Sequence, residues 1–432
     1  MNLLYRLFPD AGRYAMVEAT YPRLTLAAGT CLVVGFFIYF GHRDAKDWGD
    51  KLFGNVFLLQ ALALLVYGTS RATHSVIAER SDKTWELQRL TPQSAFDLAM
   101  GKLLGAPIYA YFIAAALMPW AVVGALGSTE ISLGRFLSFY ATLGAGAFFA
   151  LSTGLLASAY ADKTVGGSTA ASAGALLGFM ALQLAFALWT LLERSGLRIP
   201  FCGLDLPTWA FLQGSLAAFG AWAFAGAKWR IGRDLLEERA LWRLPAFLAF
   251  LVGYQLGFAP TAPYTVMIAP AFFCYFAAVL HSEPLDHWKN WLVTGEDARI
   301  LNRIPTWLSA WLAYAALAAL VALLGLGSRS PSSYPLMQTA FLGRDLAFLQ
   351  WCRFTKSRNP EILALVFIGL AYGLPLVTVG PLMGGRYAQV VALFLPVPAR
   401  DGNLAVNVVP GALQAAAAFW ALLVALRARL RS

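Results

Sequence analysis

Stretches of about 20 consecutive, mostly apolar residues recur along the whole chain, and only short polar breaks separate them. A helix of about 20 residues spans the hydrocarbon core of a lipid bilayer. The apolar stretches are continuous rather than alternating with polar residues, so the pattern of a membrane-spanning barrel is absent. The sequence therefore predicts an all-α, polytopic integral membrane protein.

The composition agrees with this prediction. A chain of 432 residues would ordinarily form two or three soluble domains, but 59% of its residues are hydrophobic and only 13% are charged. No segment remains that would form a soluble catalytic domain.

The apolar stretches predict about 12 transmembrane helices in two series of six. The first series lies at about 24–40, 52–69, 104–126, 135–160, 166–192 and 207–227, and the second at about 244–260, 261–281, 306–327, 336–351, 361–380 and 404–426. The basic stretch 228–243 separates them, so we expect two six-helix units at residues 1–227 and 228–432. Leucines at helical spacing, with Arg6 and Arg13, predict a short amphipathic helix in the membrane interface within residues 1–23, at the start of the first unit.

The distribution of basic residues predicts the orientation in the membrane. If the N-terminus is cytoplasmic, 23 of the 33 Lys and Arg residues lie in cytoplasmic segments. This bias is typical of cytoplasmic loops, so we expect both termini in the cytoplasm. The net charge of +10 is then explained by membrane topology, and no nucleic-acid partner is expected.

The segment from His74 to Pro107 is the longest charged stretch between two of the early spans. Asp82 or Ser81 can cap a short helix that ends near Leu90. Thr91 as the N-cap and Pro92 at the first helical position would then start a second helix. The sequence therefore predicts a helix, a sharp turn and another helix.

Four landmarks in this segment carry a family resemblance: Ala78-Glu79-Arg80, Thr84 with Leu87, Leu90-Thr91-Pro92 and Gly101-Lys102-Leu103. The run resembles the loop after the second membrane helix of type-2 ABC transporter permeases. In that family the loop contains the coupling helix, which docks on a separate ATPase subunit. Position 83 is Lys where the family usually has a small residue or Gly.

The resemblance implies a role for six residues. Glu79 and Arg80 would make polar contacts with the ATPase, Trp85 and Leu87 would form an apolar docking edge, and Thr91 and Pro92 would fix the turn. The chain has no GxxxxGK[ST] phosphate-binding loop. ATP and magnesium would therefore be bound by the partner ATPase, and this chain would be a permease and exporter component rather than an enzyme, located in the plasma membrane, a bacterial inner membrane.

The two halves contain similar motifs in the same order, which suggests a tandem duplication. Glu283 and Trp288 follow the second span of the second half as Glu79 and Trp85 follow that of the first. Residues 281–305, with Trp288 and Trp291 on one helical face, would form a second coupling segment. The alternative is an interfacial helix whose tryptophans lie at the lipid headgroups.

The Leu-Gly-Arg triplets at 133–135 and 342–344 are a second pair of similar motifs. Arg344 and Asp345 are also the exceptional charges inside a predicted span. They indicate either an internally neutralised pair near the end of the span or a segment 336–351 that does not cross fully.

Other features favour structural roles. Gly174 and Gly178 form a GxxxG spacing in a run of small residues, which favours close helix packing. The four cysteines lack a CxxC spacing, so we expect inert core residues. The four histidines lie in loops or at span ends, and no metal site is predicted.

Two other classes of function fit the predicted topology. A gradient-driven secondary transporter also has two six-helix repeats, although it usually keeps acidic residues in its spans. A polytopic lipid-linked sugar transferase would present acidic residues on an outer loop, where Asp44, Asp47 and Asp50 are the candidates. The sequence does not identify a substrate.

Overall fold

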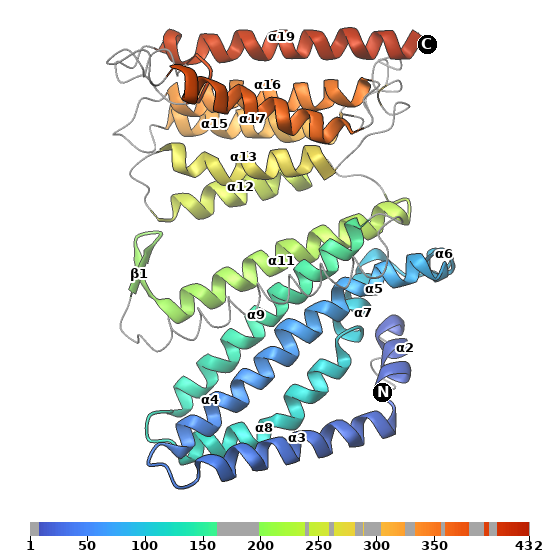
Figure 1. Cartoon of the computed structure of the whole chain (residues 1–432), viewed down its shortest axis with the longest axis vertical. Coiled ribbons are helices and arrows are strands. Elements are labelled where there is room, and N and C mark those ends of the chain that lie inside the picture. The colour runs from blue at the N-terminus through green and yellow to red at the C-terminus, as the bar shows by residue number, and fades with distance from the viewer. Residues whose placement is uncertain are drawn as a thin grey trace. The chain divides into compact units, whose positions relative to one another are not determined.

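The computed structural model divides the chain into two compact units, each described separately below (Figure 1). Unit 1 comprises Met1–Ile199 and Asp205–Glu238, and unit 2 comprises Pro200–Leu204 and Arg239–Ser432. The residues that the structure describes are 8–161, 198–237, 242–258, 263–280, 288, 304–324, 333–355, 359–379, 393–396 and 404–431. The predicted span 166–192, with Gly174 and Gly178, lies outside the described residues.

The described secondary structure is helical apart from one hairpin. Unit 1 contains α2 (Pro9–Glu18), α3 (Tyr21–His42), α4 (Trp48–Ala61), the π-helical segment η1 (Leu62–Gly68), α5 (Thr69–Ser81), α6 (Thr84–Arg89), α7 (Ala95–Gly105), α8 (Ile108–Gly127), α9 (Leu133–Tyr160) and α11 (Thr208–Asp234). Unit 2 contains α12 (Arg243–Leu256), α13 (Pro263–Leu280), α15 (Thr306–Leu323), α16 (Ser333–Phe354), α17 (Pro360–Val379) and α19 (Leu404–Arg431).

A helix covers every predicted span that lies in the described residues. Among those residues, seven helices are long and apolar enough to cross a membrane: Tyr21–His42, Trp48–Ser81, Ile108–Gly127, Leu133–Tyr160, Thr208–Asp234, Thr306–Leu323 and Asn407–Arg429. The chain is therefore an all-α, polytopic membrane protein. The predicted boundary between the halves at residue 227 lies inside α11, which continues to Asp234.

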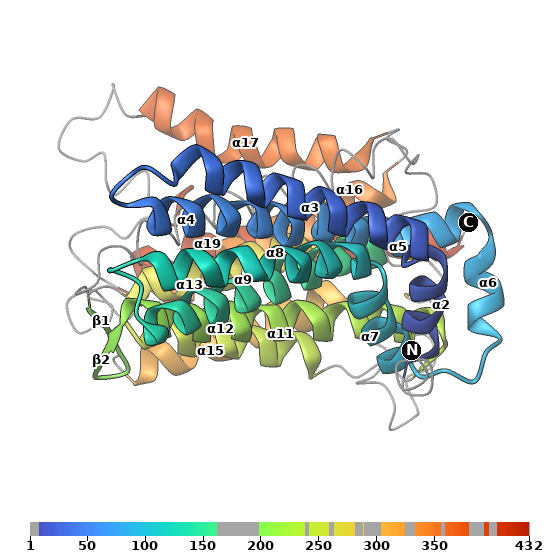
Figure 2. The same ribbon diagram turned by 90° about the horizontal axis from the view of Figure 1, so that it is seen from below.

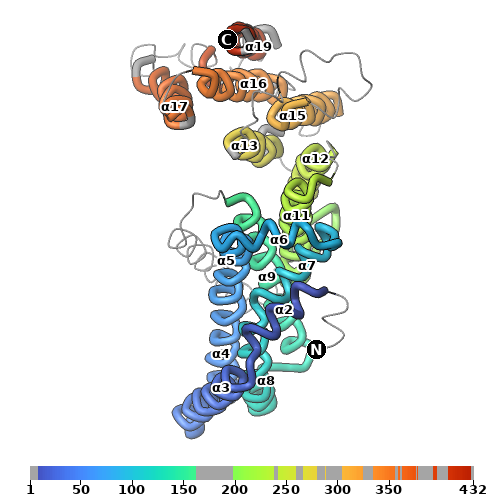
Figure 3. The backbone as a smooth tube through the Cα atoms, turned by 90° about the vertical axis from the view of Figure 1, so that its right-hand side faces the viewer, coloured from blue at the N-terminus to red at the C-terminus, as the bar shows by residue number. Residues whose placement is uncertain are grey.

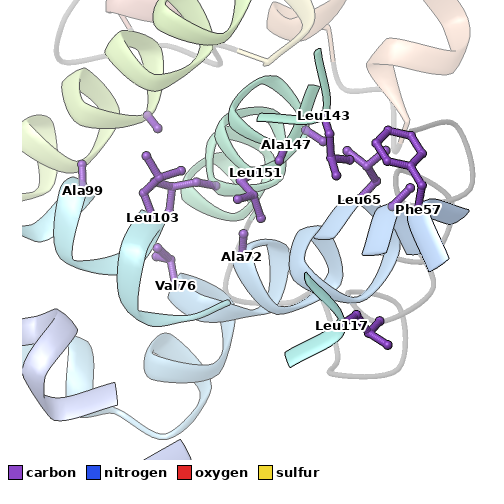
Figure 4. Packing of buried hydrophobic residues seen from close by; sticks show 14 of the residues in the cluster. Phe57, Leu65, Ala72, Val76, Ala99, Leu103, Leu117, Leu143, Ala147 and Leu151 are labelled. Carbon is purple, nitrogen blue, oxygen red and sulfur yellow. The ribbon is translucent and has the colours of Figure 1, made fainter. Parts of the chain in front are cut away.

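Close packing of α4 and α5 against α8 and α9 forms the core of unit 1. Figure 4 shows Leu143, Ala147 and Leu151 of α9 facing Leu65 of η1 and Ala72 of α5. Glycines bring the α4 and α8 backbones together, because a Cβ atom on Gly124 would lie 2.7 Å from the backbone nitrogen of Phe53. Such close approach of backbones is how helices associate in lipid without a hydrophobic driving force.

The second span is longer than the sequence predicts. The predicted helix ends near residue 69, but α4, η1 and α5 form one helix from Trp48 to Ser81, 34 residues long. A helix of that length is roughly 50 Å long, so it extends well beyond a hydrocarbon core of about 30 Å. Its last turns are polar, and their charged side chains find partners at that end of unit 1.

A two-stranded hairpin, β1 (Arg198–Phe201) and β2 (Leu204–Pro207), interrupts the helical fold. Its turn residues Cys202 and Gly203 both have positive φ, 52° and 77°, as in the tight turns that suit the twist of a hairpin. Cys202 is exposed, so the prediction of an inert core cysteine is wrong at this position. Cys31, Cys274 and Cys352 are buried, which confirms the prediction for them.

Four helix pairings of unit 1 recur in unit 2, whereas the packing of α15 on α16 in unit 2 has no comparable counterpart between α8 and α9. In unit 1, α3 and α4 pack on α8, α5 packs on α9, and α9 packs on α11. In unit 2, α12 and α13 pack on α15, α13 also packs on α16, and α16 packs on α19. Figure 3 shows the unit 2 helices nearly end-on, with α16 between α15 and α17. Numbered by the predicted spans of each half, the shared pairs are the first span with the third, the second with the third, the second with the fourth, and the fourth with the sixth.

The Leu-Gly-Arg triplets do not occupy equivalent places in this arrangement. Leu133 and Gly134 lie in the exposed first turn of α9, whereas Leu342 is buried in the middle of α16. This pair of motifs therefore gives no structural support for a duplication.

Candidate functional site

Three short elements form a bent segment at one end of unit 1, which we call the elbow: the last turn of α5, helix α6 and helix α7 (residues 79–105). Figure 2 shows α6 beyond the end of α5, with α7 and the N-terminal helix α2 at the same end. The two-helix prediction is correct in outline. Lys83 makes the bend between α5 and α6, with φ of 59° in the left-handed region that favours glycine.

The predicted start of the second helix is wrong by three residues. Thr91 and Pro92 lie in the exposed link before α7, and the N-cap is Ser94 instead. The Ser94 hydroxyl accepts from the backbone nitrogen of Asp97 at 3.2 Å, and the Asp97 carboxylate accepts from the backbone nitrogen of Ser94 at 3.3 Å. This capping box satisfies two donors, whereas the Thr91 hydroxyl donates back to the Gln88 carbonyl at 2.7 Å.

A buried cluster of charges holds the elbow to the N-terminal helix. The ammonium of Lys102, which is fully buried on α7, donates to a carboxylate oxygen of Glu79 and lies 3.2 Å from one of Asp10 on α2. Arg13 pairs with both carboxylates, at 2.9 Å for Asp10. Two acids and two bases thus balance in charge, as a buried ionic group requires to avoid a large desolvation cost.

Neutral donors complete the coordination of Glu79. The Gln88 amide on α6 donates to it at 2.9 Å, and the Tyr14 hydroxyl on α2 donates at 3.2 Å. Burial, together with the Glu79 and Asp10 carboxylates, raises the pKa of Tyr14 above its usual range, so its hydroxyl remains a donor. Glu79 therefore connects the end of α5 to α2, α6 and α7.

The adjacent Arg80 connects the elbow to the long helices. Its guanidinium donates to the carbonyls of Ala159 and Ala161 at the end of α9, at 3.1 and 2.6 Å, and to Asp234 at the end of α11, at 2.7 Å. These bonds satisfy carbonyls that the end of α9 leaves without a helical partner. A movement of the elbow would consequently be transmitted to α5, α9 and α11.

Trp85 is inside the elbow rather than on its surface. It is 3% exposed, and its ring lies beneath two cations, 5.6 Å from Arg80 and 5.4 Å from the Lys102 ammonium. The expected docking edge of Trp85 and Leu87 is therefore wrong for Trp85, which packs inward because α6 is only six residues long and has one buried face. Glu79 is likewise buried and Arg80 is largely so.

The most exposed apolar side chains of the elbow are Leu87 and Leu90, and Phe96 is exposed to a smaller degree. Leu87 is 66% exposed and Leu90 is 83% exposed, with the Glu86–Arg89 ion pair at 2.8 Å beside them. Large apolar side chains this exposed in a polar segment at the end of a membrane helix are typical of a protein-docking edge. The elbow therefore presents two leucines on a support that is fixed by buried ion pairs.

The sequence did not identify the partners of Lys102. Asp10 lies 92 residues before it, and neither the spacing nor the resemblance connects them. The sequence did contain a sign of close helix packing beside Lys102, because Gly101 and Gly105 lie four residues apart on one face of α7. A Cβ atom on either glycine would lie 2.8 Å from an atom of α2, so the two helices pack backbone to backbone there.

Little of the predicted second coupling segment is described. Trp288 is buried, with ring centroids 6.1 Å from Trp307 and 5.7 Å from Phe354. Glu283 and Trp291 lie outside the described residues. Within the described parts of the chain, no group of three or more His, Cys, Asp or Glu residues could hold a metal ion.

Known proteins provide no further guidance on the site. Comparisons with protein-family models, with curated proteins and with solved structures gave no match.

Proposed function

We propose that this chain is the membrane-spanning permease of an ATP-driven exporter of type 2 and works with separate ATPase subunits. The observation that carries the proposal is the elbow, where Leu87 and Leu90 are exposed on a segment that the buried Glu79, Trp85 and Lys102 hold in place. The family resemblance of residues 78–103 supports the same role. In this proposal the elbow, both termini and the ATPase are on the cytoplasmic side of a bacterial inner membrane, and the ATPase holds ATP and magnesium.

The contacts of the elbow suggest how force would reach the membrane. Closure of the ATPase subunits on ATP would push Leu87 and Leu90. The continuous helix Trp48–Ser81 would transmit the push directly, and the Arg80 bonds would carry it to α9 and α11. Packed helices shift as rigid bodies rather than deform, so the result would be rocking of the helices and alternating access.

We further propose that the chain contains 12 spans in two duplicated six-helix units. The shared order of helix pairs in both units supports this. A sequence match accompanies it, because Leu212-Gln213 in the first half of α11 recurs as Leu413-Gln414 in the first half of α19. Each glutamine bonds to the fourth helix of its own unit: Gln213 donates to Thr142 at 3.0 Å, and Gln414 accepts from Arg344 at 2.7 Å.

One observation favours the alternative of a gradient-driven secondary transporter. Arg344 and Asp345 are buried at the centre of α16, and charges inside a membrane are often part of a transport pathway. Transport by the purified chain in vesicles with a proton or sodium gradient and without ATP would support this alternative.

A crosslinking experiment tests the docking role directly. A photoreactive amino acid at position 87 is expected to crosslink in cells to a nucleotide-binding protein, whereas the same label at Leu133 is not. Leu133 is a matched control, because it is also an exposed leucine but lies at the opposite end of α9, roughly 40 Å away. Equal crosslinking from both positions, or none from position 87, would count against docking by the elbow.

A further inference from the structure

The centre of α16 contains a polar group that the proposed coupling role does not use. Arg344 is 8% exposed and Asp345 is 2% exposed. Both lie near the middle of a 22-residue helix, roughly 15 Å from either end. The pair is therefore not near an end of α16, which is not among the seven helices long and apolar enough to cross a membrane. Its internal neutralisation is confirmed by a distance of 2.7 Å from the Arg344 Nε to an Asp345 carboxylate oxygen.

Among the described residues, Asp345 accepts hydrogen bonds from three donors, which lie on three helices. One carboxylate oxygen accepts from the Tyr275 hydroxyl of α13 and from the Tyr372 hydroxyl of α17, both at 2.5 Å. The other accepts from the Nε of Arg344. The carboxylate is thus well satisfied without any ligand.

Arg344 is not satisfied to the same degree. Its Nη1 donates to the Gln414 side chain at 2.7 Å and to the Phe394 carbonyl at 3.4 Å. Its Nη2 is buried and has no hydrogen-bond partner among the residues that the structure describes. A buried donor without an acceptor is unfavourable, and a charged one more so, so such a group is a candidate binding site.

We propose that this centre binds a neutral oxygen acceptor, an ester or amide carbonyl of a membrane-soluble amphiphile, at the Nη2 of Arg344. The charge of Arg344 is already balanced by Asp345, so an anionic ligand would leave a net negative charge in an apolar interior, which is strongly unfavourable. A carbonyl supplies the acceptor without adding charge.

A ligand would reach the Nη2 of Arg344 from the side that α17 covers. Nη2 is buried, and Tyr372 of α17 lies over the guanidinium, with its ring centroid 5.0 Å away. Among the described elements, α17 packs chiefly on α16, and many of its apolar side chains are exposed, including Leu365, Val366 and Leu370. A small displacement of α17 would therefore open the centre toward the surrounding lipid. This inference does not depend on the ATPase-coupling role, because it concerns binding to the chain alone.

A matched pair of ligands tests the proposal. Monododecanoylglycerol has an ester carbonyl, and dodecylglycerol ether has the same head and chain without it. Binding to the full chain in maltoside micelles is followed by tryptophan fluorescence. The ester is expected to bind about tenfold more tightly than the ether, as a hydrogen bond to a charged donor predicts, and Arg344→Lys should remove the preference. Arg135→Lys, at a half-buried arginine of unit 1, should keep it.

Two results would overturn the proposal. One is equal affinity of the unmodified protein for ester and ether; the other is tighter binding of dodecyl phosphate than of the ester. If Arg344→Lys does not fold, the infrared band of a ¹³C-labelled ester carbonyl on the unmodified protein decides the question. A shift to lower frequency on binding is expected, and an unshifted band would contradict the proposed hydrogen bond.

Discussion

Lys102 is the residue on which the geometry of the elbow depends most. Its ammonium lies between Asp10 and Glu79 in a fully buried position. Lysine at such a position is tolerated only because both partners are present, and removal of one member of a buried ionic group leaves the others uncompensated.

We therefore expect Lys102→Met to lower the free energy of unfolding by about 3–5 kcal/mol, since two carboxylates would then face Arg13 alone. Lys51→Met is the matched control, because Lys51 pairs with Asp47 on the surface at 2.8 Å and should cost less than about 1 kcal/mol. The measurement is denaturant unfolding in mixed micelles. Equal effects of the two substitutions would show that the buried cluster is not structural. Adding Glu79→Gln to Lys102→Met should recover part of the loss.

Lys83 is a second residue at which substitutions should change the free energy of unfolding in a predictable direction. Its φ of 59° is unfavourable for a residue with a Cβ atom by about 1–2 kcal/mol, and glycine costs about 0.5–1 kcal/mol in the unfolded chain. Lys83→Gly should therefore raise the free energy of unfolding by about 0.5–1 kcal/mol, and Lys83→Val should lower it. Unfolding of both variants under the same conditions checks the sign; a loss of stability in Lys83→Gly would contradict the described bend.

At the scale of elements, the sequence predicts that a helix covers each described span, but it does not predict where each helix ends. Apolar periodicity marks each described span. It does not predict that α5 continues to Ser81, because the polar last turns are stabilised by partners distant in the sequence, such as Arg13 and Asp234. The β1–β2 hairpin was missed for a local reason, since its Cys202-Gly203 turn lacks the Asn-Gly signature.

The packing of α2 on α7 leads to a prediction for elements. A Cβ atom on Gly105 would lie 2.8 Å from the Cα atom of Ala11, whereas one on Gly144 of α9 meets nothing within 4 Å. Gly105→Ala should therefore separate α2 from α7 and speed hydrogen exchange of the α2 amides. Gly144→Ala should leave that exchange unchanged and stabilise α9 by up to about 1 kcal/mol. Unchanged exchange of α2 in Gly105→Ala would show that α2 does not depend on this contact.

At the scale of the whole molecule, the proposed orientation can be tested with a native residue. Cys202 is exposed, and the other three cysteines are buried. With both termini cytoplasmic, Cys202 is on the outer side, so a membrane-impermeant maleimide should label it in intact cells. A cysteine at position 87, introduced with Cys202→Ser, should react only after the membrane is opened. The reverse pattern would invert the topology and exclude docking of a cytoplasmic ATPase on the elbow.

The proposed duplication was only partly readable from the sequence. The six-plus-six series of spans is visible in the hydropathy pattern, but the Leu-Gly-Arg match proved misleading because Leu133 and Leu342 occupy different environments. The shared helix pairs depend on contacts between distant segments, which a single sequence does not show. The same reason explains why Trp85 was expected on the surface: the cations that cover it, Arg80 and Lys102, come from two different helices.

The central claim is that this chain is driven by a separate ATPase that docks on the elbow. The most direct test is to purify the tagged protein from its own cells in mild detergent, identify the accompanying proteins by mass spectrometry and assay ATP hydrolysis. We predict a stoichiometric nucleotide-binding subunit with ATPase activity, lost in Leu87→Glu with Leu90→Glu and retained in Leu133→Glu. A pure protein without a nucleotide-binding subunit and without ATP hydrolysis would contradict the account.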